Sequence, residues 1–549
     1  MRARPQRLCL GLACLVGPAV VSAQSDTLWT FNAPAKIRYT RVGPSGHLLV
    51  ATEQGLIALN PEVGSVAWAY PAGGRAWFRV SPLGHLLVGH GGVLTAVDPV
   101  TGDTVWHRVD LPDLSRAELG MSAADPYGIV QANRSLMALD LRSGVTLWDS
   151  TALPDRVGVR EFFRLRDLGA ALLIAQTPLS DAALLTVTLD SGRVLWRRDS
   201  LFRRPLHFAE RRGIEYLATF QAHEFGDTTI LLYFSEDGPM RLDQRTGAVL
   251  WRAEQLAGRS VPGRDRGYPV PRVSGGLALI GVERRLVALE LGSGRVRWET
   301  ERDFRDEPTW IVPSSGMIMV GGFGREKPFL ACLDAATGAR KWARDVELKR
   351  EATAYFLRDT VYVSNDGALS AVPLATGDVR RLTEVGFQGG EHPVRMDTVE
   401  GGGLVLRARQ NIMRVWLDGR VAYRRYYQAP GTSLLAKLAS TALIVAANVG
   451  SIALTPPGGY APVIVGNPVL AARYARAATA ENYHYLFTQS PDSLDQEGFS
   501  LVLMDQRDGQ ELGRLWFDER SPDYGLDHVT ATVYVREGDR QIVARRFRF

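Results

Sequence analysis

The chain has 549 residues, of which 46% are hydrophobic, and its 64 basic and 59 acidic side chains give a formal net charge of +5. A chain of this length can form one large buried core or more than one domain. A protein that binds nucleic acid ordinarily shows a pronounced basic imbalance, so a chain this close to neutral is not expected to bind it.

The first 23 residues are predicted to be a secretory signal peptide. Arg2, Arg4 and Arg7 precede an apolar stretch over 8–21, and Val-Ser-Ala at 21–23 provides the small residues of a cleavage site. This segment contains three arginines and no acidic residue, so its removal lowers the formal charge from +5 to +2. We therefore expect an exported protein, located in the periplasm or the outer cell envelope.

A lipid anchor at Cys14 is the less favoured alternative for the same segment. Leu12 and Ala13 precede this cysteine, but Gly11 stands where a branched apolar residue would be expected, and the apolar stretch before it is short. The chain is therefore expected to be exported without a lipid anchor.

After the signal peptide, the sequence Thr-Leu-Trp-Thr-Phe (27–31) resembles the second half of a unit that then recurs along the chain. The complete unit has 13 residues and ends on tryptophan, and its seven strongest copies cover 56–68, 94–106, 136–148, 184–196, 239–251, 286–298 and 330–342. A repeat of this kind indicates an architecture built from one supersecondary unit.

Each unit predicts a β-hairpin. Five residues alternate as in a strand, a polar stretch ends on glycine at the ninth position, and a second strand carries the tryptophan. The glycine supplies the positive φ that the turn requires. Because seven tryptophans occupy the same position, we expect one repeated packing contact between neighbouring sheets, made by Trp68, Trp106, Trp148, Trp196, Trp251, Trp298 and Trp342.

The pattern continues in a weaker form beyond residue 342. Segment 369–381 has Arg381 at the tryptophan position, 411–423 has Tyr423 there, and 451–463 and 501–513 keep the glycine without the aromatic residue. A twelfth unit is present only as its first half, 541–549. We expect its missing strand to be 27–31, so that the two ends of the chain pair and close a ring.

The motif Leu-x-Ala-Leu-Asp, two residues, Thr-Gly, three residues and Trp resembles the repeat of the quinoprotein alcohol dehydrogenase-like β-propellers, also called PQQ-like repeats. This resemblance implies an all-β fold of four-stranded blades around a central channel, commonly eight, with the tryptophan strand outermost. The family includes quinone-dependent dehydrogenases and a non-catalytic outer-membrane assembly lipoprotein. The resemblance is therefore more informative about the fold than about the function.

The number of blades is the open point of this prediction. Twelve units of roughly 44 residues exceed the four to eight blades of a typical propeller. We predict eight or more blades in one propeller assembly over 24–549, with two propellers dividing near 300–310 as the alternative.

The resemblance also indicates which residues a bound cofactor would require. A dehydrogenase of this family holds its quinone between a Trp and a disulfide of adjacent cysteines, with calcium on Glu, Asn and Asp. Here Cys9 and Cys14 belong to the predicted signal peptide, and Cys332 remains alone at a position where other units have alanine. We therefore expect Cys332 to be a buried core residue and no cofactor to be bound, with PQQ and calcium as the alternative.

No catalytic residue and no metal ligand can be assigned from the sequence. The chain contains no Gly-x-Ser-x-Gly, His-Glu-x-x-His or Cys-x-x-Cys-His motif, and its nine histidines are scattered. The apolar segment 434–454 contains Lys437 and Asn448, so we expect successive buried strands there and no transmembrane span in the mature chain.

The longest connections between repeats are rich in arginine. They lie between the fourth and sixth units, and the residues singled out are Arg203, Arg204, Arg211, Arg212, Arg264 and Arg266. Long loops often carry binding residues. These arginines are therefore either solvated blade edges interleaved with acidic residues, or a surface for an acidic partner, an anionic envelope polymer or an anionic lipid.

Three functions are compatible with these observations. The leading expectation is a non-enzymatic, exported β-propeller that binds a protein partner in the bacterial cell envelope. The alternatives are a PQQ-dependent alcohol or sugar dehydrogenase and a module that binds a glycan or small ligand. No residue in the sequence selects a particular ligand.

Overall fold

The computed structural model describes most of the chain between residues 26 and 547. Residues outside this description are 1–25, 72–75, 115–116, 123–124, 133–134, 154–157, 177–181, 200, 203–207, 212–213, 218–219, 226–227, 235–236, 260–270, 302, 324–326, 343–344, 430–472, 474–481, 490–497 and 548–549. The predicted signal peptide, the apolar segment 434–454 and the unit 451–463 therefore lie outside the described residues.

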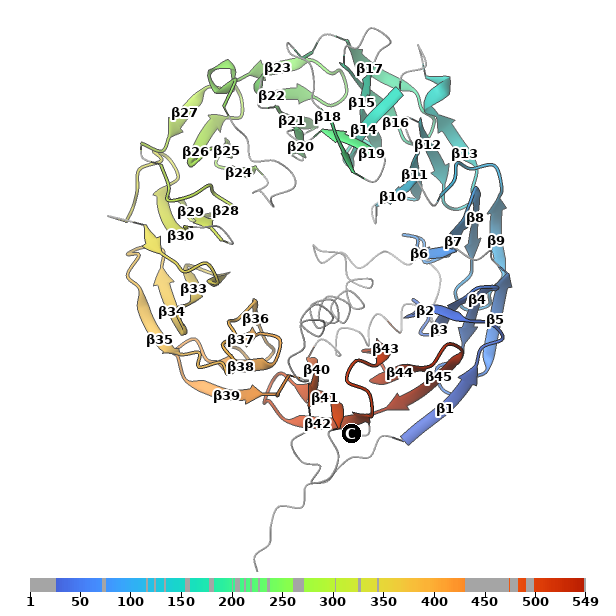
Figure 1. The fold of residues 1–549 in the computed structure, drawn as a ribbon. Coiled ribbons are helices and arrows are strands. Elements are labelled where there is room, and N and C mark those ends of the chain that lie inside the picture. The colour runs from blue at the N-terminus through green and yellow to red at the C-terminus, as the bar shows by residue number, and fades with distance from the viewer. Residues whose placement is uncertain are drawn as a thin grey trace, which may run out of the picture.

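The described chain forms antiparallel sheets that follow one another around a ring (Figure 1). Each complete sheet has four strands in sequence order, the first on the inner side of the ring and the fourth on the outer side (Figure 1). In the first six sheets the outer strand carries the repeat tryptophan, as the resemblance implies. The all-β propeller prediction is confirmed.

Four sheets occupy the first part of the ring. The first two consist of β2 (Ile37–Val42), β3 (Leu48–Thr52), β4 (Gly55–Leu59), β5 (Val66–Pro71), β6 (Trp77–Val80), β7 (Leu86–His90), β8 (Val93–Val97) and β9 (Thr104–Arg108). The next two consist of β10 (Glu118–Met121), β11 (Tyr127–Ala132), β12 (Ser135–Asp140), β13 (Thr146–Asp149), β14 (Gly158–Leu165), β15 (Ala170–Gln176), β16 (Ala182–Thr188) and β17 (Val194–Arg198). A 3-10 turn, η1 (Ser150–Ala152), follows β13.

The fifth to ninth sheets continue the same order. Two consist of β20 (Phe220–Glu224), β21 (Thr229–Phe234), β22 (Gly238–Asp243), β23 (Val249–Arg252), β24 (Arg272–Ser274), β25 (Leu277–Val282), β26 (Arg285–Glu290) and β27 (Val296–Glu299), and η3 (Glu254–Leu256) follows β23. Three consist of β28 (Trp310–Ser314), β29 (Met317–Gly322), β30 (Phe329–Asp334), β31 (Val346–Glu347), β32 (Thr353–Leu357), β33 (Thr360–Asn365), β34 (Ala368–Pro373), β35 (Arg380–Glu384), β36 (Arg395–Thr398), β37 (Leu404–Arg407), β38 (Asn411–Val415) and β39 (Val421–Tyr426).

The last two sheets differ from this plan. In the described residues the tenth has three strands, β40 (Tyr483–Gln489), β41 (Phe499–Asp505) and β42 (Glu511–Phe517). The eleventh contains β43 (Asp523–Asp527), β44 (Thr532–Glu537) and β45 (Gln541–Arg546), completed by β1 (Asp26–Asn32) from the other end of the chain. A separate hairpin, β18 (Phe208–Arg211) and β19 (Ile214–Leu217), lies between the fourth and fifth sheets (Figure 1).

The two ends of the chain close the ring, as predicted from their sequences. β1 pairs with β45 in antiparallel register, with Trp29 opposite Ala544 and Thr30 opposite Val543. Trp29 also packs in one core cluster with Ile57 of β4, in the next sheet. The strand pairing removes an exposed sheet edge that would otherwise be open to association with other chains.

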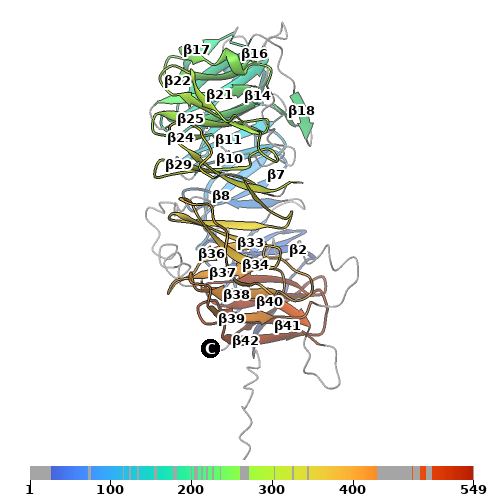
Figure 2. The same cartoon turned by 90° about the vertical axis from the view of Figure 1, so that its left-hand side faces the viewer.

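The core lies between neighbouring sheets. Figure 2 shows the ring from its edge, with these sheets stacked along it. Buried apolar residues from one sheet interlock with those of the next; one cluster joins Leu286 and Trp298 to Ile311 and Phe329. The core is therefore continuous across residues 300–310, where a two-propeller arrangement would divide the chain.

Within the described residues, eleven of the predicted units correspond in order to the eleven sheets of the ring. The remaining unit, 451–463, falls outside the described residues. No helix formed by the described residues combines the length and the apolar character that a membrane crossing requires.

Candidate interaction face and inner wall

Six of the seven repeat tryptophans lie in the outer strands, Trp342 precedes the outer strand β31, and all seven reach across to the following sheet. Trp68 is only 7% exposed, and its indole N–H donates a hydrogen bond to the carbonyl of Pro99 at 3.3 Å. The corresponding bonds run from Trp106 to Leu141, Trp148 to Leu189, Trp196 to Gln244, Trp251 to Leu291, Trp298 to Ala335 and Trp342 to Leu374, at 2.7–3.1 Å. A buried indole N–H thus has an acceptor at every one of these junctions.

The glycine of the next unit provides the surface on which each ring packs. Gly102 has a φ of 80°, and a Cβ atom built there would lie 2.4 Å from Cβ and Cγ of Trp68. Only glycine tolerates both this backbone conformation and this close approach. Tryptophan and glycine therefore form one repeated contact between neighbouring sheets, even though they belong to different units of the sequence.

Two junctions without the repeat tryptophan show how the contact varies. Tyr423 takes the tryptophan position, donates its hydroxyl to the carbonyl of Gln506 at 2.7 Å, and packs its ring on Gly509. Arg381, by contrast, is exposed and pairs with Glu384 in its own sheet. An aromatic ring with a polar end can thus replace tryptophan, whereas the junction that follows Arg381 has no such ring.

The predicted arginine surface lies almost entirely beyond the described residues. Arg203, Arg204, Arg212, Arg264 and Arg266 are outside the description. Arg211 ends β18, but its side chain is also outside the description. The surface formed by these arginines therefore stays a prediction.

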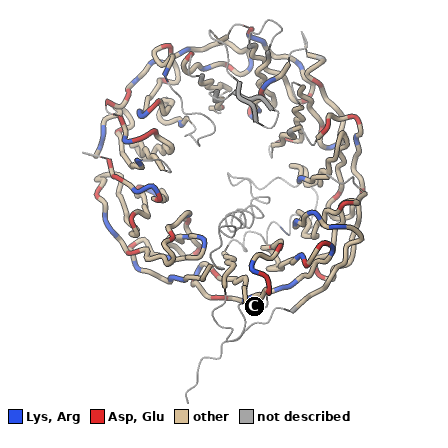
Figure 3. The backbone as a smooth tube through the Cα atoms, viewed as in Figure 1, with Lys and Arg blue, Asp and Glu red and all other residues tan. Residues whose placement is uncertain are grey.

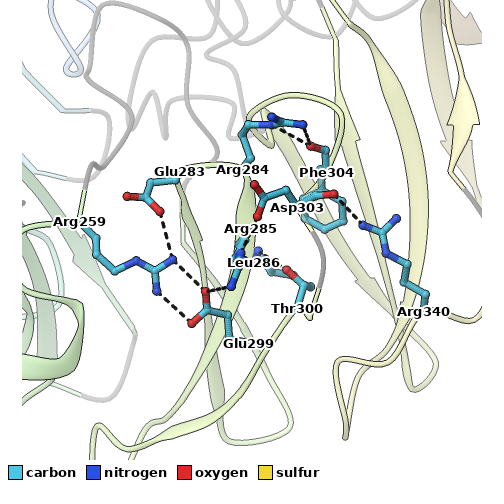
Figure 4. A network of polar contacts seen from close by, with 10 residues as sticks. All are labelled: Arg259, Glu283, Arg284, Arg285, Leu286, Glu299, Thr300, Asp303, Phe304 and Arg340. Atoms are coloured by element: carbon cyan, nitrogen blue, oxygen red, sulfur yellow. Dashed lines mark hydrogen bonds and ion pairs between the residues drawn. The ribbon is translucent and has the colours of Figure 1, made fainter.

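A neighbouring arginine network is described on the connections that join outer to inner strands (Figure 4). We call this side of the ring, with the turns between second and third strands, the connection face. Arg259, after η3, donates to both carboxylate oxygens of Glu299 at 2.9 and 3.0 Å and to Glu283 at 3.3 Å. A planar guanidinium is suited to such bidentate pairing.

The same network extends to the next sheet. Arg285 binds Glu299 at 3.2 Å and Asp303 at 2.6 Å, and Arg340 donates to the carbonyl of Asp303 at 3.3 Å. Arg284 donates to the carbonyl of Phe304 at 2.9 Å (Figure 4). The network thereby joins the connection before the β24–β27 sheet, the sheet itself and the connection that follows it.

Pairing with arginine lowers the pKa of two carboxyl groups in this network. The hydrogen bonds from Arg259 hold the pKa of Glu299 below its usual value, and those from Arg285 do the same for Asp303. Because Arg259 and Glu299 are partly exposed, their pair contributes only about 0–1 kcal/mol. The network presents an ordered surface with its charges largely balanced.

Two adjacent inner strands carry a second arginine cluster, which the sequence did not reveal. We call Arg38, Tyr39 and Arg41 of β2 together with Trp77 and Arg79 of β6 the inner-wall cluster; Figure 3 shows basic positions on these inner strands. Tyr39 is 37% exposed, and Arg38, Arg41 and Arg79 are exposed as well.

Aromatic contacts order the inner-wall cluster. Tyr39 stacks on Phe78 with a centroid distance of 5.4 Å and donates its hydroxyl to the carbonyl of Ala76 at 3.2 Å. The Arg79 guanidinium lies over the Trp77 ring at 5.6 Å and donates to the carbonyl of Leu119 at 2.9 Å. Burial raises the pKa of Tyr39, while the nearby charges of Arg41 and Arg38 act in the opposite direction.

The expectation that no cofactor is bound, and its alternative of PQQ with calcium, both stay predictions. No group of three His, Cys, Asp or Glu side chains comes together in the described residues as a metal site would require. Cys332 is buried without a disulfide partner, and burial raises the pKa of its thiol to about 11. We therefore assign no residue of the described chain to a quinone or to calcium.

The fold defines the chain as a β-propeller of PQQ-like repeats. A family model described as outer membrane protein assembly factor BamB matches residues 19–201 and 236–445. Because the match covers more than half of the chain, the chain belongs to this BamB-like family of propellers. The unmatched stretch between the two segments includes the β18–β19 hairpin.

Solved structures of other propellers show similarity at low identity. BamB from Moraxella catarrhalis is 16% identical, with 62% of this chain and 97% of that chain covered and a TM-score of 0.29. Quinohemoprotein alcohol dehydrogenase from Comamonas testosteroni is 13% identical, with 65% and 75% covered and a TM-score of 0.30. No curated protein matches the chain.

Proposed function

We propose that the protein is an exported, non-enzymatic β-propeller that binds a protein partner in the cell envelope and contributes to the assembly of outer-membrane proteins. The family match carries this proposal, because the matching model is described as an outer membrane protein assembly factor. The segment predicted to be a signal peptide supports export to the periplasm or outer envelope.

The connection face supplies the physical basis for binding a protein. Glu299 links Arg259 and Arg285, and Arg285 also pairs with Asp303, so side chains before, within and after one sheet are held in a fixed relation. A surface that is ordered before binding loses less conformational entropy when a partner docks. The balanced charges favour a polar partner surface of mixed sign over a strongly charged polymer.

Site-specific photocrosslinking in the envelope tests the location of this surface. A photoreactive residue at exposed Glu301, in the connection after β27, should capture an envelope protein, whereas one at exposed Ser293 on the opposite side of the same sheet should not. Equal capture at both positions, or capture at Ser293 alone, would contradict the assignment of the connection face.

Two further measurements test the function itself. Deletion of the gene should lower the amount of folded outer-membrane proteins, and unchanged amounts would contradict a role in their assembly. Purified protein mixed with PQQ and calcium should acquire neither quinone absorbance nor reduction of an artificial electron acceptor. If it acquired both, the protein would be a dehydrogenase rather than a non-enzymatic scaffold.

A further inference from the structure

The inner-wall cluster contains guanidinium groups that lack carboxylate partners. Arg38, Arg41 and Arg79 form no ion pair within the described part of the chain. Two arginines on other inner strands do: Arg164 of β14 binds Asp125 at 2.6 Å, and Arg395 of β36 binds Asp397 at 2.7 Å. Uncompensated positive charge therefore gathers on β2 and β6, in contrast to the balanced network of the connection face.

Protection of exposed sheet edges does not explain this cluster. Charged side chains often blunt edge strands and so prevent pairing with other chains. In this ring, however, the inner strands β28 (Trp310–Ser314) and β32 (Thr353–Leu357) contain no charged residue at all. β2 and β6 also differ from the inner strands β14 and β36, which carry acidic residues beside their arginines.

The backbone of β2 is irregular at Arg38. The pairing of β2 with β3 shifts between Ile37 and Tyr39, so Arg38 is an extra residue at a β-bulge. A bulge re-aims the side chain that it carries and is common beside functional sites. Beyond the bulge, Tyr39 and Arg41 share one side of the strand because side chains alternate.

Aromatic rings beside these guanidinium groups add an apolar component. Tyr39 keeps more than a third of its surface exposed although it is stacked on Phe78. Trp77 packs closely on Gly89, where an added Cβ would lie 2.4 Å from the indole ring. Both rings are therefore held in place, and they can receive an apolar group without further ordering.

We propose that the inner-wall cluster binds an extended, acidic segment of a partner polypeptide. Carboxylates of the segment pair with Arg38, Arg41 and Arg79, and its apolar side chains pack against Tyr39 and Trp77. β2 and β6 are each the terminal strand of their sheet, so their channel-side backbone groups can also pair with an extended chain. This backbone pairing favours a polypeptide over a polysaccharide, and the near-neutral charge of the protein disfavours nucleic acid.

Fluorescence anisotropy with a dye-labelled peptide that alternates glutamate and leucine tests the proposal on the purified protein. The peptide should bind more weakly as salt increases, and the double variant Arg38→Glu/Arg41→Glu should reduce its affinity about tenfold or more. The matched control Arg295→Glu, at an exposed turn on the other side of the ring, should leave the affinity unchanged.

Additional peptides separate the contributions of charge and of backbone pairing to the affinity. A peptide with glutamine in place of glutamate should bind weakly, and one with N-methylated backbone amides should lose affinity while it keeps its charge. If the double variant fails to fold by circular dichroism, Arg41→Gln alone should still lower the affinity and flatten its salt dependence.

Several results would overturn the proposal. These are equal peptide affinity in the double variant and the wild type, equal loss in the Arg295→Glu control, or no peptide binding at low salt. Binding of polygalacturonate, anionic vesicles or single-stranded DNA that requires Arg38 and Arg41, while the acidic peptide does not bind, would also overturn it. Each failure is independent of photocrosslinking at Glu301, so it leaves the proposed function separately testable.

Discussion

A tryptophan of one sheet and a glycine of the next form the contact that recurs around the ring. At Trp251 the indole N–H donates to the carbonyl of Leu291 at 2.7 Å, while its six-membered ring packs on Gly294. Leu291 and Gly294 belong to the same turn. One turn thus supplies both the acceptor and the flat surface, and this explains why the two residues recur together.

A single methyl group should therefore weaken a junction between sheets. Gly294 and Gly316 both have positive φ, 69° and 77°, but a Cβ at Gly294 would lie 2.4 Å from Trp251, whereas one at Gly316 meets nothing within 4 Å. Gly294→Ala should lower the free energy of unfolding by about 1–3 kcal/mol more than Gly316→Ala. Urea denaturation measures both; equal losses would show that the contact with tryptophan does not restrict this position.

The Arg259–Glu299 pair predicts how the free energy of unfolding changes with pH. Hydrogen bonds from Arg259 lower the pKa of Glu299 below its usual value of 4.5. Because the folded-state pKa is the lower one, the ionised carboxylate stabilises the fold above about pH 4.5, and this contribution is lost as the pH falls through the lowered value.

Glu299→Gln should accordingly be less stable than the wild type at pH 7, by about 1 kcal/mol or less. The difference should shrink as the pH is lowered from 5 to 3, as measured by urea denaturation. Glu351→Gln, at an exposed site without an ion pair in the described structure, should show little difference at any pH. A wild-type advantage over Glu299→Gln that persists unchanged at pH 3 would contradict the assignment.

At the scale of elements, the sequence motif locates the outer half of each sheet. The alternating residues, the turn glycine and the tryptophan define the third and fourth strands, for example β26 and β27 around Gly294. The first two strands have no fixed residue at any position, so the motif leaves their bounds open. For the same reason the β18–β19 hairpin, which contains no tryptophan, was not predicted.

The candidate sites were less predictable than the fold. The arginine-rich connections were recognisable from their density of charge, but only the structure shows that Arg259 and Arg285 share Glu299. Arg38 and Arg41 belong to an inner strand outside the repeat motif. Their significance depends on the absence of carboxylate partners in the described residues, a property of tertiary packing that no local pattern records.

Closure by β1 and β45 can be tested with a designed disulfide. Thr30 and Val543 lie opposite each other, and Cys332 is buried, so a Thr30→Cys/Val543→Cys variant should form one new bond across the closure. The oxidised form should be more stable by about 2–4 kcal/mol, because the bond restricts the unfolded chain. Dithiothreitol should remove this gain, and the single-cysteine variants should not show it.

At the scale of the whole molecule, the ring contains more sheets than the eight that are common in propellers of this repeat type. With more sheets, each one turns through a smaller angle relative to its neighbour, and the inner strands lie on a wider circle (Figure 1). Side chains such as Arg38 and Tyr39 can then remain exposed on the inner wall. The connection face, the surface proposed for a protein partner, is correspondingly long.

Electron microscopy of the purified protein tests the central claim. This claim is that the sheets form one closed ring, in which the two ends of the chain meet by the pairing of β1 with β45. Class averages should show a single ring with a central opening and no gap in its circumference. Two smaller rings joined near residues 300–310, or one arc open between β1 and β45, would contradict it.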